Sequence, residues 1–350
     1  MCGIVGIITK DSSRINEEKI TRVCNSLLHR GPDGEGYWTN QSHTVAFGHR
    51  RLSIIDLTEA ASQPMHYLDR YTIVYNGEIY NYPELKEDLV RKGYRFHTTS
   101  DTEVLLAAYA AFGKDCLHQL DGMFAFAIWD DEKQELFCAR DRMGEKPFFF
   151  SYFNNTVAFA SEMKALWEMG VSKEVNSSML YNFLTIGYTS NPADPQETFF
   201  SRIHKLPAAC CLYYSFATQE LTIEKYWHAD IDVNHNIKEE DAIVQFQQLL
   251  STSVKRRLRS DVAIGTSLSG GLDSSSIVAL CDLNSTAQYT HKCFTASFTG
   301  YEKDETEYAR IVATKYGLEH HAVNISEEEI PSLMEKIIAI QEEPFSSASV

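Results

Sequence analysis

The sequence has 350 residues, 44% of them hydrophobic and 23% charged, which is the composition of a globular chain long enough for two or three domains. It carries 32 Lys and Arg against 48 Asp and Glu, and the acidic excess is spread over the whole chain, with 22 against 30 in residues 1–230 and 10 against 18 in 231–350. This net negative charge excludes non-specific nucleic-acid binding. The apolar stretches are too short for a membrane helix, and the N-terminus lacks the features of a signal peptide. We therefore expect a soluble cytoplasmic protein.

Short apolar segments separated by turns fill the first part of the chain. Two helices interrupt them, Pro83–Lys92 and Thr102–Phe112, with Pro83 in a first turn and Asp101 as the expected N-cap. Many short strands with few helices favour antiparallel sheets over a doubly wound fold. The predicted strands are Ile4–Ile8, Leu52–Leu57, Thr72–Tyr75, Met123–Trp129, Leu136–Ala139, Pro147–Tyr152 and Thr156–Ala160.

The pattern changes after residue 213. Residues 214–236 are polar and aromatic without periodicity, which predicts a linker between a first domain, 2–213, and a second, 237–350. In the second domain helices and strands alternate strictly, which predicts an α/β parallel sheet with covering helices. The predicted helices are Glu239–Leu258, Asp273–Leu283, Asp304–Tyr316 and Glu327–Ile340, and the strands are Val262–Leu268, Lys292–Phe298 and His320–Ile325.

Cys2 stands apart from the other cysteines. The eight cysteines form no CxxC pair, so a zinc site is poorly supported and free thiols are expected. If Met1 is removed, Cys2 carries both a thiol and the α-amine of the chain, and the amine can take the thiol proton near neutral pH. By position alone, a frayed terminus with an incidental cysteine is an equal alternative.

Seven motifs follow one another in the first domain: MCGIVGI, LLHRGPDGEG, HRRLSIIDL, YNGEIYNY, SDTEVLL, LDGMFAFAIWD and ARDRMGEKPFFF. Together they resemble the class II glutamine amidotransferase domain, whose fold is an αββα sandwich of the N-terminal-nucleophile hydrolase type. The resemblance implies that Cys2 is the nucleophile and that Asn76 and Gly77 stabilise the oxyanion. It also implies that Arg51 binds the α-carboxylate of glutamine, that Glu78 and Asp101 bind its α-ammonium, and that Asn76 contacts the substrate.

Each of these residues also has a simpler interpretation. Asn76-Gly77 is a common hairpin-turn dipeptide, Asp101 can cap a helix, and Arg51 can be a surface charge. Arg50 and Arg51 are adjacent, and we favour Arg51 because it directly precedes the LSIID segment, as the arginine of the family does.

A second candidate site lies where a predicted strand runs into a helix. Its turn contains Ser269, Gly270, Gly271, Asp273 and Ser274. Two glycines permit close backbone approach, and hydroxyls with helix N-terminal amides form an anion cradle. The loop lacks the lysine of a P-loop, which suits a pyrophosphate that stays bound, and Asp273 could share a Mg²⁺ with its oxygens.

This loop resembles the SGGxDSS loop of the ATP pyrophosphatases. The resemblance implies that ATP is cleaved to AMP and pyrophosphate, and that Leu268 and Ala296 contact the adenosine. The order of the two domains, and the SEMKAL segment at Ser161–Leu166, resemble the glutamine-dependent asparagine synthetases. For this family the resemblance implies aspartate, glutamine and ATP as substrates, Mg²⁺, a homodimer, and a shielded passage for ammonia.

One departure from the family concerns the end of the sequence. The later SGEGxDE-like segment does not occur, so we expect residues 1–350 alone to hydrolyse glutamine while making little asparagine. The acceptor is therefore open, and another glutamine-dependent amide ligase, acting on a different carboxylic acid, is the nearest alternative. A non-catalytic module is disfavoured because Cys2, Arg51, Asn76, Glu78 and Asp101 are all present.

Overall fold

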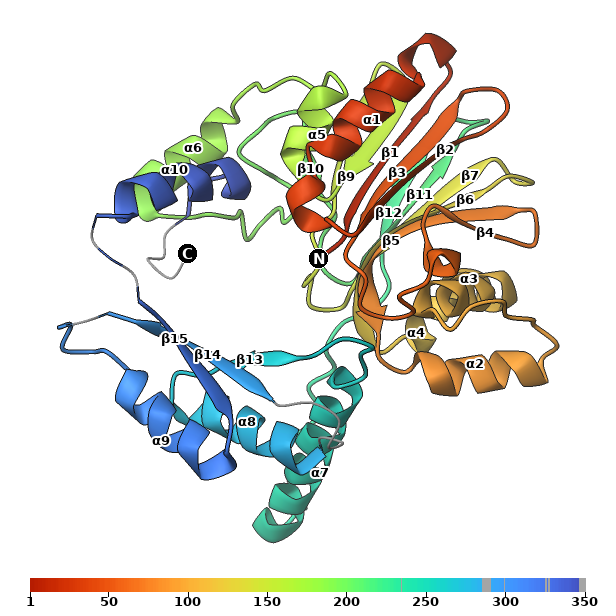
Figure 1. Ribbon diagram of the computed structural model, residues 1–350. Coiled ribbons are helices and arrows are strands. Elements are labelled where there is room, and N and C mark those ends of the chain that lie inside the picture. The colour runs from red at the N-terminus through yellow and green to blue at the C-terminus, as the bar shows by residue number, and fades with distance from the viewer. Residues whose placement is uncertain (234, 285–290, 299, 325, 327, 346–350) are drawn as a thin grey trace. The chain divides into compact units, whose positions relative to one another are not determined.

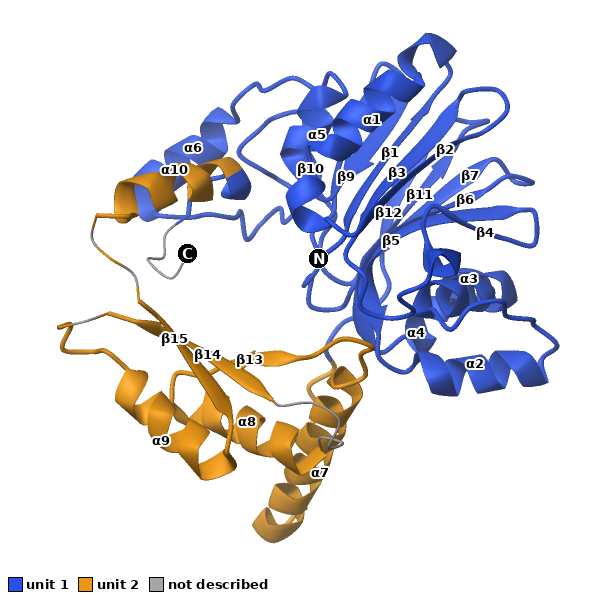
Figure 2. Ribbon diagram, in the orientation of Figure 1, with its two compact units in different colours: residues 1–229, 340–350 blue, residues 230–339 orange. Residues whose placement is uncertain are grey.

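The computed structural model of the protein describes residues 1–233, 235–284, 291–298, 300–324, 326 and 328–345. The chain forms two compact units (Figure 2). Unit 1 comprises residues 1–229 and 340–350, and unit 2 comprises residues 230–339. Each unit has its own sheet structure and its own apolar core.

Unit 1 is built on two six-stranded antiparallel sheets, ordered β10-β8-β9-β1-β3-β2 and β12-β11-β7-β6-β5-β4. The first sheet contains β1 (Gly3–Thr9), β2 (Gly34–Thr39), β3 (Val45–Arg51), β8 (Phe149–Phe153), β9 (Thr156–Ala160) and β10 (His204–Lys205). The second contains β4 (Met65–Tyr67), β5 (Tyr71–Ile79), β6 (Gly122–Asp130), β7 (Glu135–Arg140), β11 (Cys210–Ser215) and β12 (Leu221–Lys225).

Helices cover the outer faces of both sheets, so that unit 1 has four layers (Figure 1). Helices α1 (Glu17–Asn25) and α5 (Met163–Glu168) pack on the first sheet, and α2 (Tyr82–Arg91), α3 (Asp101–Phe112) and α4 (Cys116–Gln119) lie on the second. The apolar core between the sheets includes the fully buried rings of Phe47, Trp129 and Phe159. The αββα sandwich predicted from the sequence is confirmed.

The predicted strand at Leu52–Leu57 is wrong. Strand β3 ends at Arg51, and the chain then turns out of the sheet. Asp56 has a positive φ of 54°, and its carboxylate accepts hydrogen bonds from the backbone N–H groups of Thr58 (3.1 Å) and Thr99 (2.8 Å). Leu52, Ile54 and Ile55 of this segment line a cavity instead of pairing as a strand.

The interval 214–236, expected as a linker, contains regular structure as far as Lys225. Strand β12 pairs with β11 from Leu221↔Tyr214 to Lys225↔Cys210. Leu221 and Ile223 alternate along β12 and pack against the core between the two sheets, which gives this short strand its register. Helix α6 (Ser177–Ile186), like α1, was not predicted.

Unit 2 is an α/β structure, as predicted. Its parallel sheet has the order β13 (Gly265–Ser267), β14 (Lys292–Ser297) and β15 (Glu319–Asn324). The helices are α7 (Glu239–Arg257), α8 (Leu272–Asn284), α9 (Thr306–Tyr316) and α10 (Ile330–Gln341), the last of which runs on into unit 1. Ile325 and Glu327, at the ends of a predicted strand and a predicted helix, lie outside the described residues.

Residues 340–345 group with unit 1 although the sequence assigned them to the second domain. The Glu342 carboxylate accepts hydrogen bonds from the backbone N–H groups of Met163 (2.6 Å) and Lys164 (2.8 Å), at the start of α5. Glu343 accepts another from the N–H of Phe199 at 2.9 Å. These bonds tie the SEMKAL segment to the acidic residues that follow α10.

All eight cysteines are free thiols, as expected, and seven of them are buried, whereas Cys2 is only partly covered. Within the described ranges, the chain contains no helix with the length and apolarity needed to cross a bilayer.

Candidate active site

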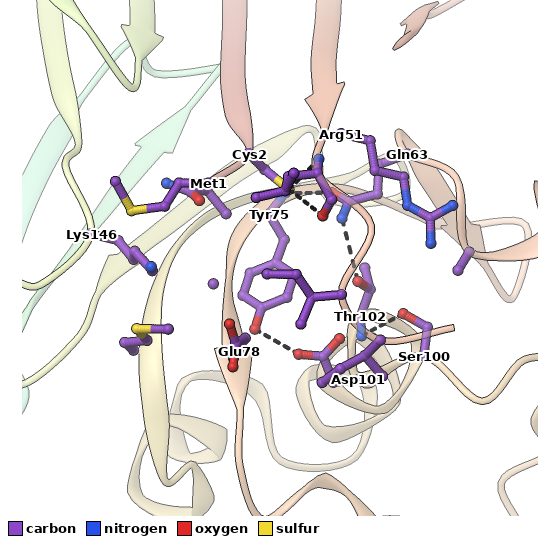
Figure 3. Close-up of a pocket in the computed structure, with 17 residues that line it drawn as sticks. Met1, Cys2, Arg51, Gln63, Tyr75, Glu78, Ser100, Asp101, Thr102 and Lys146 are labelled. Carbon is purple, nitrogen blue, oxygen red and sulfur yellow. Dashed lines mark hydrogen bonds between the residues drawn. The ribbon is translucent and has the colours of Figure 1, made fainter. Parts of the chain in front are cut away.

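A cavity of about 130 Å³ lies beside the N-terminus in unit 1 (Figure 3). Its wall is formed by the start of the chain, the loop after β3, strand β5, the beginning of α3 and the loop between β7 and β8. Every residue that the amidotransferase resemblance assigned lines this cavity: Cys2, Arg51, Asn76, Gly77, Glu78 and Asp101. Residues that are up to 99 positions apart in the sequence therefore share one site.

Cys2 lies directly before β1 and faces the loop that follows β3. The backbone nitrogen of Leu52 is 3.4 Å from the sulfur, and its carbonyl oxygen is 3.6 Å away. Nε of Arg30 donates a hydrogen bond of 2.9 Å to the carbonyl of Cys2, which fixes the backbone of the residue. Burial raises the pKa of the Cys2 thiol, so the sulfur needs a base to become a nucleophile.

The chain terminus brings an amine into the same cavity as that thiol. Burial lowers the pKa of the Met1 amine, and the cations of Arg30 and Lys146 lower it further. Within the described part of the chain, no histidine lines the cavity. His49 is buried nearby and its pKa falls to about 3 because of burial, so its ring is neutral, with Nε2 3.2 Å from the carbonyl of Tyr75.

Asn76 and Gly77 lie inside β5 and do not form a hairpin turn. They pair with Ala125 and Phe124 of β6. Asn76 is 1% exposed, and its Nδ2 finds no hydrogen-bond partner among the described residues. A buried donor without a partner is costly unless a ligand satisfies it, so this amide is suited to an oxyanion. A Cβ on Gly77 would lie 2.3 Å from the carbonyl oxygen of Met123, which explains the glycine.

Glu78 and Asp101 bring two carboxylates to the cavity wall. Oδ2 of Asp101 accepts hydrogen bonds from the hydroxyl of Tyr75 (2.8 Å) and the backbone N–H of Ile79 (3.0 Å). Burial raises the pKa of both carboxyls. The expected N-cap role of Asp101 is wrong, because Oγ of Ser100 accepts the capping hydrogen bond and Asp101 is the first residue of α3.

Arg51, and not Arg50, reaches the cavity. Its guanidinium donates to the carbonyl of Thr58 at 2.7 Å and to that of Asp56, which orients the group while leaving further N–H donors for a ligand. Arg50 has the opposite orientation on β3 and forms a 2.6 Å ion pair with Glu35. The adjacent arginines thus have different environments.

Five further polar residues of the cavity were not predicted: Gln63, Tyr75, Ser100, Thr102 and Lys146. The Gln63 side chain joins two elements, because Oε1 accepts from the N–H of Tyr75 (2.6 Å) and Nε2 donates to Oγ1 of Thr102 (3.3 Å). Lys146 is part of the ARDRMGEKPFFF motif, but nothing local distinguishes it from a solvent-exposed lysine.

The predicted phosphate loop lies in unit 2, between Leu268 and α8. The hydroxyl oxygens of Ser269 and Ser274 are 3.0 Å apart, and the N–H of Gly271 donates to Oγ of Ser269 at 3.3 Å. The turn therefore gathers hydroxyl groups and amides before the first turn of a helix, which is the strand–turn–helix context that anion binding requires.

Gly270 is the position of this loop that requires glycine. Its φ is +81°, and a Cβ would lie 2.5 Å from the backbone carbon of Tyr308. We expect Gly270→Ala to destabilise unit 2 by about 1–3 kcal/mol. The matched control is Gly271→Ala, where the nearest atom is Oγ of Ser269 at 3.3 Å and the cost should stay below about 1 kcal/mol. Thermal unfolding of both variants measures the difference, and equal losses would contradict the strain argument.

The other residues assigned to ATP have mixed environments. The side chain of Leu268 is buried in the core of unit 2, together with Val278 and Cys293. Ala296 is exposed on β14, and Asp273 is exposed in the first turn of α8. No group of three or more potential metal ligands occurs in the part of the chain that the structure describes.

The fold and the cavity define a class of protein, an N-terminal-nucleophile-type amidotransferase domain joined to a parallel α/β unit, and comparison with known proteins gives the family. The family model for the glutamine amidotransferase domain matches residues 1–227, and the model for asparagine synthase matches residues 245–350. The chain belongs to the family of glutamine-hydrolysing asparagine synthetases.

Individual relatives match along almost the whole chain. A putative glutamine-hydrolysing asparagine synthetase of Methanocaldococcus jannaschii is 36% identical over 369 residues, covering 100% of this chain and 70% of the relative. Asparagine synthetase 1 of Bacillus subtilis is 36% identical over 354 residues, covering 99% and 54%. A protein named amidase chry2, of Gibberella zeae, is 30% identical over 373 residues, covering 98% and 54%. The chain thus spans little more than half the length of the latter two.

Proposed function

We propose that this chain hydrolyses glutamine in the cavity of unit 1, and that the ammonia serves an ATP-dependent synthesis of asparagine. The observation that carries the proposal is the buried, unpartnered Nδ2 of Asn76 in the same cavity as the Cys2 thiol. A nucleophile and an unsatisfied donor in one small cavity are the two parts that an acyl-transfer site needs.

The chemistry begins with a proton transfer. After removal of Met1, the α-amine of Cys2 takes the thiol proton, and the sulfur attacks the side-chain carbonyl carbon of glutamine. Nδ2 of Asn76 and the N–H of Gly77 stabilise the oxyanion. The ammonium of Cys2 returns the proton to the leaving nitrogen, so ammonia departs and a γ-glutamyl thioester remains. Water then hydrolyses the thioester to glutamate and regenerates the thiol.

Charged groups select the substrate. The Arg51 guanidinium has the fork geometry that binds a carboxylate through two parallel hydrogen bonds, so it is assigned to the α-carboxylate of glutamine. Glu78 and Asp101 are assigned to the α-ammonium, because they are the carboxylates of the cavity wall.

Two variants, one that removes the charge of Arg51 and one that keeps it, test the assignment of Arg51 to the α-carboxylate. We expect Arg51→Leu to raise the KM for glutamine by about 100-fold and to lower kcat less, because the interaction exists in the ground state and the transition state alike. Arg51→Lys keeps the charge without the fork and should give an intermediate KM. Steady-state measurement of glutamate release gives both constants. An unchanged KM in Arg51→Leu would show that Arg51 does not bind the α-carboxylate of glutamine.

Unit 2 is assigned to activation of the acceptor acid. The β-carboxylate of aspartate attacks the α-phosphorus of ATP, giving β-aspartyl-AMP and pyrophosphate, and ammonia then displaces AMP to form asparagine. The loop containing Ser269, Gly270, Gly271 and Ser274 would hold the pyrophosphate. Asp273 fits a Mg²⁺ that is held mainly by phosphate oxygens, since such ions use only one or two carboxylates, and the ion would neutralise phosphate charge.

The second candidate is an amide ligase with another acceptor acid. The similarity to a protein named as an amidase supports this second candidate, because proteins that are about one-third identical to the chain do not all carry the name asparagine synthetase. Supplying the full-length protein with glutamine, ATP and a panel of carboxylic acids distinguishes the two. Asparagine as the main amide supports the first, and a different amide formed faster than asparagine supports the second.

A further inference from the structure

Lys146 is a buried cation in the cavity to which no role has been assigned. The residue is 5% exposed, and its side chain points into the cavity from the loop between β7 and β8 (Figure 3). Its backbone is held on both sides: the N–H donates to Oδ2 of Asp141 at 3.0 Å, and the carbonyl accepts from Nε of Arg140 at 2.7 Å. A lysine at this position places its charge in the wall of the cavity and not on the exposed surface.

The charges of the cavity explain why a second cation is useful there. A glutamine zwitterion would pair its carboxylate with Arg51 and its ammonium with Glu78 and Asp101. Two carboxylates for one ammonium leave an excess negative charge in a buried place, which is unfavourable unless a cation compensates it. Lys146 is the remaining cationic side chain of the cavity wall in the described part of the chain.

The electrostatic coupling between Lys146 and Glu78 runs in both directions. Burial raises the pKa of Glu78, and Lys146 opposes that change. Burial lowers the pKa of Lys146, and Glu78 opposes that change in turn. Each charge thus stabilises the other. We propose that Lys146 is the counter-cation of the ammonium-binding carboxylates, keeping Glu78 ionised so that Glu78 and Asp101 together bind the single α-ammonium of a free amino acid.

This role rests on the proposed function and makes Lys146 a positioning residue that acts through Glu78. Other charged groups also face Glu78: Asp101 at the start of α3 and the N-terminal amine before β1. Glu145, Arg30 and Cys2 in addition affect Lys146. Among the described residues, two cations act on Glu78, the N-terminal amine and Lys146, and Lys146 can be replaced without altering the nucleophile.

The pH dependence of the KM for glutamine tests the proposal. In Lys146→Met, Glu78 should protonate at a higher pH than in the wild type, because the variant loses a positive charge that favours the ionised carboxylate. We expect the KM to rise about tenfold near pH 6 and less than about threefold near pH 8.5, where Glu78 is ionised in both proteins. The kcat should change less than the KM at every pH, and Lys146→Arg should restore most of the affinity.

A double variant separates this role from a structural one. If Lys146 acts through Glu78, Lys146→Met combined with Glu78→Gln should be no worse than Glu78→Gln alone. Additive losses in the double variant would overturn the proposal, and so would a rise in KM for Lys146→Met that is the same at every pH. A fall in kcat of Lys146→Met with unchanged KM would also overturn it, because Lys146 would then act on the chemistry at Cys2. Lys146→Gln provides the same test if the methionine variant does not fold. A wild-type protein that does not hydrolyse glutamine would instead refute the proposed function itself.

Discussion

Replacement of Cys2 by alanine is expected to lower glutamine hydrolysis by at least about a thousandfold, because no other group of the cavity can form the thioester. The expected loss is in kcat, since Arg51, Glu78 and Asp101 remain to bind the substrate. Cys2→Ser should retain only a small residual rate, because a hydroxyl is a much weaker nucleophile than a thiol whose proton is taken by an adjacent amine. Release of glutamate from glutamine, measured without ATP, gives the rates.

The other cysteines provide the control. All seven are buried, and Cys210 is in the core between the two sheets of unit 1. Cys210→Ala should therefore lower thermal stability while glutamine hydrolysis continues. A diazoketone analogue of glutamine should alkylate Cys2 with loss of N₂, adding the mass of the reagent less N₂ to Cys2 and to none of the buried thiols, as seen by peptide mapping. Labelling at a buried cysteine, or undiminished hydrolysis in Cys2→Ala, would refute the assignment.

Processing of Met1 is part of the same prediction. The proposed base is the amine of Cys2, which exists only after Met1 is removed. Intact-mass spectrometry of active protein should therefore show a chain that begins at Cys2. Full activity with Met1 retained would show that the Cys2 amine is not the base. The Met1 amine would then be the next candidate for the base, because burial lowers its pKa.

The sequence predicted the cavity residues better than it predicted the elements that carry them. Cys2, Asn76 and Asp101 belong to motifs whose order along the chain is informative even when the strands are not recognised. Strands β2 and β3, with the sequences GEGYWT and VAFGHRR, mix glycine, aromatic and charged residues without alternation. They form because β3 pairs with β1 and β2 pairs with β3, which is tertiary information that a local pattern lacks.

The wrong strand at Leu52–Leu57 and the unpredicted burial of Lys146 have the same physical origin. The apolar run at Leu52–Leu57 has the composition of a buried strand, yet it is apolar because it forms part of a cavity wall. Lys146 has the identity of a surface residue, yet it is 5% exposed because it forms part of the cavity wall. In both cases the cavity is completed by residues distant in sequence, such as Cys2 and Asp101, so neither composition nor periodicity could indicate the burial.

The second prediction with a large effect concerns Asn76. Asn76→Ala is expected to lower kcat for glutamine hydrolysis by about 100- to 1000-fold, because the lost amide would stabilise charge that develops only in the transition state. The KM should change by less than about threefold for the same reason. The expected loss of stability is small, because Nδ2 of Asn76 has no partner in the described structure and its removal breaks no hydrogen bond.

Gln63 is the matched comparison, because it is also a buried amide in the cavity wall but both ends of its side chain are hydrogen-bonded. Gln63→Ala should leave the N–H of Tyr75 unsatisfied and lower the free energy of unfolding by about 1–3 kcal/mol, a larger effect than in Asn76→Ala. The two variants should therefore have opposite profiles, one losing mainly kcat and the other mainly stability. If Asn76→Ala instead loses stability and keeps its kcat, the unpartnered amide is a structural feature and the oxyanion must be stabilised elsewhere.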